Sequence, residues 1–261
     1  MITGAQAHRA PGGRVRVGTS GYLYRHWRGV LYPEGLGQRT WLPWYARWFD
    51  TVEMNATFYR LPSAAAVDRW REIVPREFTF AVKGSRYLTH LKRLLEVDEG
   101  VARFYEAVEH FGPKLGPVLW QLPPRMKPDL ARLDRFLSRV PAGRHAVEFR
   151  DLGWYTEETC AVLDAHGAAF CEHDQLPLPP PRRTGHWRYL RFHGATARYD
   201  GGYGPDALGR VAEDLQASAR RGEDAFVYFN NDLGGHAVRD ALTLLALLGE
   251  DRPGLEASAA R

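Results

Sequence analysis

The stretch AVEFR at residues 146–150 decides the fold, because apolar and charged side chains alternate along it. Alternation with a period of two is the pattern of a β-strand, in which successive side chains point to opposite faces. In a parallel sheet covered by helices, a charge on the helix-covered face would be costly. Val147 and Phe149 are therefore expected to face outward, while Glu148 and Arg150 turn inward.

Strands and helices alternate in both directions from this stretch. Strands are expected at 15–19, 51–55, 78–83, 117–122, 145–150, 168–172, 187–193 and 225–230. Helices are expected at 40–48, 63–72, 128–139, 156–167, 205–221 and 235–248, and in a long region that ends near 110. Eight such units predict an α/β fold with a single (β/α)8 barrel at 14–249, since about 250 residues is typical of it. A leader at 1–13 and a polar tail at 250–261 flank it, and a Pro-rich loop at 176–183 replaces the last-but-two crossover.

Composition narrows the class of protein further. The first turn, Gly18 to Gly21, lacks the GxGxxG spacing of a dinucleotide-binding sheet. The net charge of +4 over 261 residues is mild and is interpreted as a solvated surface. The start lacks the apolar core of a signal peptide and no apolar run reaches 18 residues, so no membrane association and a cytoplasmic location are expected. Cys160 and Cys171 are interpreted as buried reduced thiols.

The same parity applied to the other strands turns polar residues inward near their carboxyl ends. Six strands contribute them, namely Glu53, Asn55, Lys83, Gln121, Glu148, Arg150, Arg191, His193, Tyr228 and Asn230. In (β/α)8 barrels this end carries the active site. An internal salt bridge explains a single pair such as Glu148 with Arg191 equally well. A ligand or a reaction is the better explanation for the whole set, because so much buried charge is expensive.

The residue types in this set predict acid–base chemistry on an anion. Lys83, Arg150 and Arg191 outnumber the two glutamates, which favours a phosphate or carboxylate ligand. Glu53, Glu148 and His193 are the candidate catalytic groups, with His193 expected to titrate near neutrality. Lys83 is interpreted as a clamp for the anion, and a Schiff-base nucleophile is the alternative.

Loops add candidates around the same end. Ser20, Tyr59, His90 and Asn231 follow or lie near strand ends and are predicted to contact the substrate. Aromatic residues of the first loop either stack on a sugar or base, or cover the core; these are Tyr22, Tyr24 and Trp27. No metal ligand is assigned and no cofactor is firmly implied, because neighbouring cations oppose a divalent ion. A metal held among Glu53, Glu148, His193 and residues 172–174 is the weaker alternative.

Seven motifs in order resemble the YecE-like family, domain of unknown function 72: GTSGYLYRHWRGVLYP, FDTVEMNATFYRLP, FTFAVKGSRYLTH, VLWQLPP, AVEFRDLGW, YLRFHG and VYFNND. The resemblance runs from about residue 15 to 248 and implies a TIM-type barrel without naming a reaction. Matching positions are Gly18, Ser20, Gly21, Glu53, Asn55, Tyr59, Lys83, His90, Gln121, Glu148, Arg150, Arg191, His193, Asn230, Asn231 and Asp232. Tyr22 stands where the family commonly has tryptophan, and residues 171–174 look more variable.

Three functions are compatible with these residues. The leading hypothesis is an enzyme, a hydrolase, isomerase or lyase, that acts on a small phosphorylated or carboxylated, sugar-like substrate. The first alternative is nucleic-acid binding or metal-assisted phosphodiester processing, which rests on analogy with other barrels. The second alternative is a binding protein that catalyses nothing. The oligomeric state does not follow from the sequence.

Overall fold

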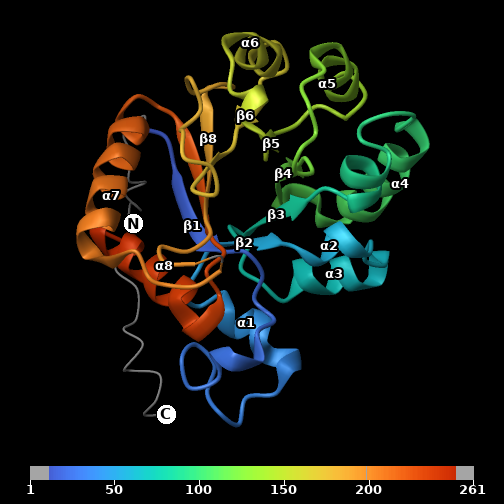
Figure 1. The fold of residues 1–261 in the computed structure, drawn as a ribbon. Coiled ribbons are helices and arrows are strands. Elements are labelled where there is room, and N and C mark those ends of the chain that lie inside the picture. Colours follow the sequence, from blue (N-terminus) through green and yellow to red (C-terminus); the bar gives the residue numbers. More distant parts are fainter. Residues whose placement is uncertain (1–11, 198, 251–261) are drawn as a thin grey trace, which may run out of the picture.

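The computed structural model describes residues 12–197 and 199–250, and strands alternate with helices along them (Figure 1). The strands are β1 (Val15–Thr19), β2 (Thr51–Met54), β3 (Thr79–Lys83), β4 (Leu115–Gln121), β5 (His145–Glu148), β6 (Ala169–Phe170), β7 (Glu172–His173), β8 (Trp187–Phe192) and β9 (Asp224–Phe229). The α-helices are α1 (Trp41–Tyr45), α2 (Ala56–Tyr59), α3 (Ala64–Glu72), α4 (Asp98–Val108), α5 (Leu130–Leu137), α6 (Glu157–Ala165), α7 (Gly204–Arg220) and α8 (His236–Leu247). The expected leader and tail lie outside the described residues, apart from 12, 13 and 250.

All strand pairs are parallel and form two sheets, ordered β2-β3-β4-β5-β6 and β1-β9-β8-β7. The expected strand 168–172 is split, because β6 pairs with β5 while β7 pairs with β8. The amide of Cys171, between them, donates to the carbonyl of Val147. At the other edge, Ser20 bridges to Glu53 and the Gly21 amide donates to the Glu53 carbonyl at 2.8 Å. This α/β arrangement is consistent with a barrel.

Tyr45 bridges β1 and β2 where the two strands do not form a regular ladder. Its hydroxyl donates to the carbonyl of Thr51 at 3.0 Å and accepts from the amide of Thr19 at 2.9 Å. A Cβ on Gly18 would lie 2.2 Å from the Thr51 carbonyl oxygen. The two strands therefore approach so closely that only glycine fits at position 18.

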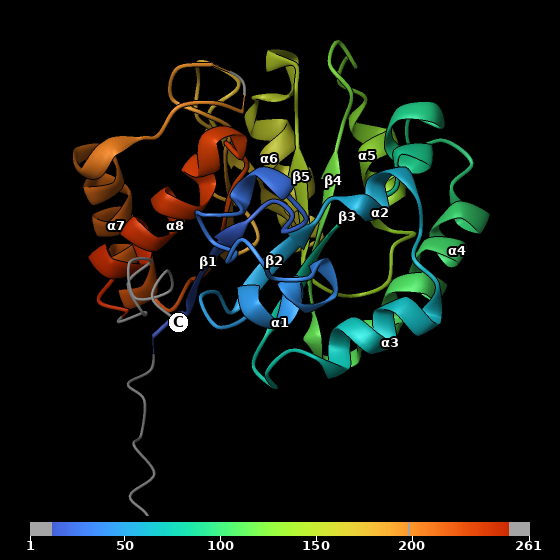
Figure 2. The ribbon, with the colours of Figure 1, turned by 90° about the horizontal axis from the view of Figure 1, so that it is seen from below.

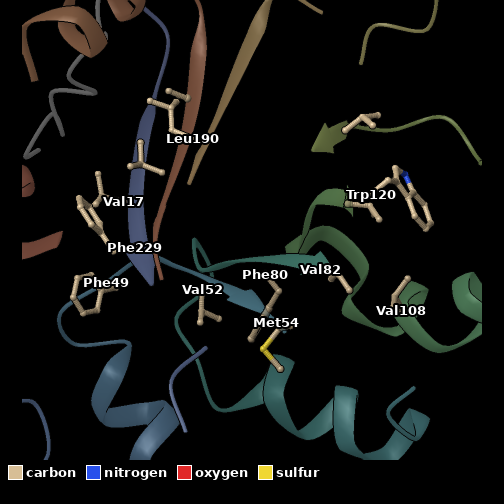
Figure 3. Close-up of a cluster of buried hydrophobic side chains, with 14 of the residues drawn as sticks. Val17, Phe49, Val52, Met54, Phe80, Val82, Val108, Trp120, Leu190 and Phe229 are labelled. Atoms are coloured by element: carbon tan, nitrogen blue, oxygen red, sulfur yellow. The ribbon is translucent and has the colours of Figure 1, made fainter. Parts of the chain in front are cut away.

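The core has an outer and an inner cluster, as the parity of the strands predicts. Outward residues such as Val52, Met54 and Phe229 pack in the larger cluster, between the strands and the helices (Figure 3). Inward residues from six strands form the smaller cluster, which contains Ala81, Leu119, Ala146, Ala169, Cys171, Trp187, Tyr189, Phe226 and Tyr228. Helices lie around the strands in both views (Figures 1 and 2). The outer face is thereby shielded, and polar inward side chains remain for the carboxyl ends.

No helix forms at 174–186, so the Pro-rich loop replaces the crossover before β8 as predicted. A cavity of about 410 Å³ lies between this loop, β8 and α7. Leu190, Phe192 and Val211 line it together with residues 176–180. The cavity thus occupies the outer face of β8, where a crossover helix would otherwise pack.

Two further predictions concern the chain as a whole. Cys160 and Cys171 are both free and buried, as expected. Within the ranges that the structure describes, no helix combines the length and apolar character needed to cross a membrane.

Candidate functional site

Arg191 lies at the centre of a buried ionic network at the carboxyl ends of the strands, here called the mouth. From β8 it donates to Glu53 of β2 at 2.8 Å and to Glu148 of β5 at 2.6 Å. Its side chain is 1% exposed and both carboxylates are fully buried. Burial alone would lower the pKa of Arg191, but the two carboxylates raise it well above its ordinary value. One guanidinium therefore pairs with carboxylates from two strands at once.

Glu53 is saturated with hydrogen-bond donors. Besides Arg191, the Ser20 hydroxyl donates to Oε1 at 2.6 Å and the Tyr189 hydroxyl donates to Oε2 at 2.6 Å. Three donors on two oxygens satisfy most of the capacity of a carboxylate. Ser20 is thus placed in the mouth as predicted, where it supports Glu53.

Glu148 accepts from Arg150 as well as from Arg191. Burial would raise the pKa of Glu148, but the two guanidinium groups hold it well below its ordinary value. At neutral pH this carboxylate is an anion that has no proton to give and little tendency to accept one. Its negative charge is compensated by the two arginines of the protein itself.

His193 is held between a carboxylate and two guanidinium groups. Its Nδ1 lies 3.1 Å from Asp174, and its Nε2 lies 3.2 Å from Arg150 and 3.3 Å from Arg191. Guanidinium groups only donate, so Nε2 accepts and the proton is on Nδ1. Burial lowers the pKa of His193 to about 4 despite the bond to Asp174. The expectation that His193 titrates near neutrality is therefore wrong, because a second positive charge beside two arginines is unfavourable.

Two residues of this network were not among the predicted catalytic or substrate-binding groups, although Asp174 belonged to the alternative set of metal ligands. Asp174 accepts from the backbone amide of His193 and from the Tyr203 hydroxyl, and it fixes the imidazole. Gln175 accepts from Arg150. Both follow β7 in an irregular loop, where no periodicity indicates the direction of a side chain. The one signal is the polar run of residues 172–175 directly after a strand.

Lys83 differs from the other cations of the mouth because it has no anionic partner. It ends β3, and its Nζ lies 4.4 Å from the centre of the Phe58 ring. In the described ranges, 12–197 and 199–250, its amine makes no hydrogen bond or ion pair. Burial and the nearby charge of Arg191 together lower the pKa of Lys83 to about 8, although Glu148 and Glu53 oppose this shift.

His90 lies beside Lys83 on the same aromatic ring. Its imidazole meets the Phe58 ring edge-on, with 5.0 Å between centroids, and its Nδ1 lies 2.9 Å from the Thr89 hydroxyl. Burial lowers the pKa of His90 to about 4, and the charge of Lys83 contributes. His90 is therefore neutral at physiological pH and packs on the same ring as the lysine.

Of the remaining candidates, some lie at the carboxyl ends of strands and others lie away from the mouth. Asn55, Gln121 and Asn230 stand at the carboxyl ends of β2, β4 and β9, and Oδ1 of Asn55 is buried with no hydrogen-bond partner. Tyr228 is fully buried one layer deeper and bonds to Thr51 at 2.7 Å. Asn231 faces away from the network and donates to Asp240 and to the Gly201 carbonyl; Tyr59 is 78% exposed.

The aromatic first loop serves mainly to cover the core. Trp27 and Tyr22 are buried in the outer hydrophobic cluster. Tyr24 is half-buried, packs on Trp27 with centroids 4.6 Å apart, and donates to the Ser20 carbonyl at 2.7 Å. Tyr22 and Trp27 are therefore not available for stacking on a ligand.

In the part of the chain that the structure describes, no three or more histidine, cysteine, aspartate or glutamate side chains lie together so that they could hold a metal ion. Glu172 turns to the outer face instead, where both its oxygens accept from Arg188 at 2.6 and 2.8 Å. It is thus not available to the mouth.

Comparison with known proteins finds relatives of the chain. The family model described as "Protein of unknown function DUF72" matches residues 16–261. The UPF0759 protein YunF of Bacillus subtilis is 26% identical over 260 residues, which is 86% of this chain and 92% of YunF. The UPF0759 protein YecE of Escherichia coli K12 is 35% identical over 108 residues, or 41% of this chain and 40% of YecE.

Solved structures show the same fold. A DUF72 family protein from Thermotoga maritima superposes with a TM-score of 0.83 at 32% identity, covering 91% of this chain and all of that one. A DUF72 family protein from Enterococcus faecalis superposes with a TM-score of 0.79 at 21% identity, covering 92% and 98% of the two chains.

Proposed function

The chain belongs to the DUF72 family, and we propose that it is an enzyme that binds a small anionic, sugar-like substrate at the mouth. We further infer that its two sheets close into one (β/α)8 barrel, because β6 and β7 are one continuous segment shared between them. In this fold the carboxyl ends of the strands carry the active site.

The observation that carries the proposal is the unpaired ammonium of Lys83. Arg191 and Arg150 pair with Glu53 and Glu148, while Asp174 accepts from the neutral donors of His193 and Tyr203. Lys83 then remains as a half-buried cation with no ion-pair partner among the described residues, and its Nζ lies over the face of the Phe58 ring. A charge that is partly withdrawn from water without a counterion is costly, and a carboxylate or phosphate of a ligand would supply one.

The ionic network would act as a rigid frame around this cation. Glu53, Glu148 and His193 each have partners that fix their protonation at neutral pH or occupy their lone pairs. We therefore transfer the role of proton carrier, first assigned to those three, to Lys83, whose pKa of about 8 lies near working pH. Asn55, Gln121 and Asn230 would supply hydrogen bonds to hydroxyl groups.

Binding of gluconate, a sugar carboxylate with constant charge above pH 5, tests the site. Isothermal titration calorimetry at pH 7 should detect binding to the wild type, and Lys83→Met should weaken it at least about tenfold, the loss of one charge-assisted contact. Lys127→Met is the matched control, since Lys127 is 79% exposed. Affinity should also fall as pH rises through about 8, where Lys83 loses its proton. Equal binding by wild type and Lys83→Met, or no binding by either, would refute the proposal.

A binding protein without catalysis is the second candidate, and the saturation of Glu53 favours it. A carboxylate that accepts from Ser20, Tyr189 and Arg191 is better suited to fix a shape than to move protons. Gluconate binding that depends on Lys83, without turnover of any sugar acid or sugar phosphate, would favour this candidate over the enzyme.

A further inference from the structure

We propose that Lys83 is an amine nucleophile which forms a Schiff base with a carbonyl group of the substrate, and that His90 accepts the proton its nitrogen releases. The proposal rests on the anion site above and deepens it: the substrate becomes an aldehyde or ketone that also carries a carboxylate or phosphate.

Lysine usage in this chain sets Lys83 apart. Only four of its 35 basic residues are lysines: Lys83, Lys92, Lys114 and Lys127. Lys92 binds Glu96, Lys127 binds Asp151, and Lys114 donates to two backbone carbonyls, one in the last turn of α3 and one just after it. Lys83 alone of the four keeps its amine free of hydrogen bonds. All other cations of the mouth are arginines, which bind anions well but cannot form an imine.

The backbone of Lys83 is fixed, which gives the amine a defined starting point. The Thr57 hydroxyl donates to its carbonyl oxygen at 2.7 Å. A Cβ on the next residue, Gly84, would lie 2.2 Å from the Trp120 ring, so strand and ring are in close contact there. The side chain then extends along Phe58, with Nζ 4.4 Å from the ring centre, and it is burial that lowers the pKa of the amine there.

The neutral amine is available in useful amounts. With a pKa of about 8, roughly one Lys83 in ten is unprotonated at pH 7, whereas for an ordinary lysine it is fewer than about one in a thousand. The same shift makes Lys83 a poor choice if its only task were to hold an anion, because its charge fades just above neutrality. Nucleophilic chemistry explains this burial better than a clamp does.

His90 is placed to take part in the proton transfers. The Thr89 hydroxyl has one proton, and it lies 3.2 Å from the Ser85 carbonyl oxygen, which can only accept. Nδ1 of His90 then donates to Thr89, and Nε2 keeps a free lone pair. His90 packs on the same Phe58 ring as the amine, and its Nε2 has no donor on it among the described residues, unlike Nε2 of His193, which accepts from two guanidinium groups. Because the pKa of His90 is about 4, it would hold a proton only briefly, as a relay.

The step balances without any further reagent. The ammonium of Lys83 first gives up one proton. The nitrogen lone pair then adds to the carbonyl carbon, the C=O π electrons move to oxygen, and oxygen takes up a proton in place of the one that the ammonium released, so the total charge is unchanged. The nitrogen then loses a proton to His90, giving a carbinolamine. His90 returns that proton to the hydroxyl, which leaves as water as the C=N bond forms. The protonated imine keeps the positive charge at the position of the ammonium, so it can still pair with the anionic group.

Reductive trapping tests the imine directly. The full chain is incubated at pH 7 with glucuronate, glyoxylate or glyceraldehyde 3-phosphate and sodium cyanoborohydride, and then analysed by intact mass and peptide mapping. We expect one adduct per chain, on the peptide that contains Lys83, and no adduct on the Lys83→Met variant. The Lys127→Met variant should be labelled at Lys83 to the same extent as the wild type. His90→Gln should slow labelling of Lys83 by about tenfold or more, the loss of a positioned proton-transfer group.

The outcomes separate the two proposals. Labelling spread evenly over Lys83, Lys92, Lys114 and Lys127, or none at Lys83 while gluconate still binds, would overturn the imine and leave the anion site in place. Equal labelling rates for wild type and His90→Gln would remove His90 from the step. Failure of gluconate binding would instead contradict the anion site itself.

Discussion

Replacing Arg191 by methionine should destabilise the protein strongly, because it leaves a buried carboxylate without a cation. Glu148 keeps Arg150, whereas Glu53 is left with two neutral donors. Removing one partner of a buried ion pair costs about 3–5 kcal/mol. At roughly 2–4 °C per kcal/mol for a chain of this size, the melting temperature should fall by about 6–20 °C. Urea denaturation followed by circular dichroism at pH 7 measures the free energy directly.

Two further variants make this test specific. Adding Glu53→Gln to Arg191→Met should recover about half of the loss, because the uncompensated charge disappears. Arg139→Met, with a 63% exposed side chain 3.6 Å from Asp98, should change stability by less than about 0.5 kcal/mol. A loss below about 1 kcal/mol for Arg191→Met, or no recovery with Glu53→Gln, would refute the view that the network is desolvated. Wild-type stability should also fall below about pH 4, since the lowered pKa of Glu148 stabilises the fold only while that group is ionised.

Two other predictions concern packing and thiols. Gly84→Ala should cost about 1–3 kcal/mol in urea denaturation, because the new Cβ would meet the fully buried Trp120 ring, whereas Gly37→Ala, with open space around it, should be nearly neutral. Burial raises the pKa of both Cys160 and Cys171, so neither thiol should react readily in the native protein. Ellman's reagent at pH 8 should therefore detect almost no thiol in the native protein and two thiols in urea. Rapid labelling of the native protein would contradict the burial of these side chains.

The inward and outward faces of the strands could be predicted because they follow from alternation alone. Val147 and Phe149 pack outward and Glu148 is fully buried within the mouth, as the pattern at 146–150 indicates. Arg188 is an exception, since it is buried on the outer face of β8. It is tolerated there because Glu172 and Asp214 both pair with it beside the loop that replaces a helix.

The pairing of charges could not be predicted, because it depends on distances between strands far apart in the sequence. Counting charges gave a cation excess shared among three residues. In the structure Arg150 and Arg191 form ion pairs with the two glutamates, and of these three cations Lys83 alone has no ion-pair partner among the described residues. The protonation of His193 depends in the same way on Asp174, which lies in an irregular loop.

The position of Arg191 has a consequence for how the protein assembles. Arg191 and Tyr189 belong to the sheet of β8, whereas their partners Glu53 and Glu148 belong to the sheet of β2 and β5. Every one of these bonds therefore crosses from one half of the molecule to the other. If only the half with β2 to β6 is folded, Glu53 and Glu148 lack Arg191, and Glu53 also lacks Tyr189. The full set of bonds around these two carboxylates therefore requires both sheets to be in place.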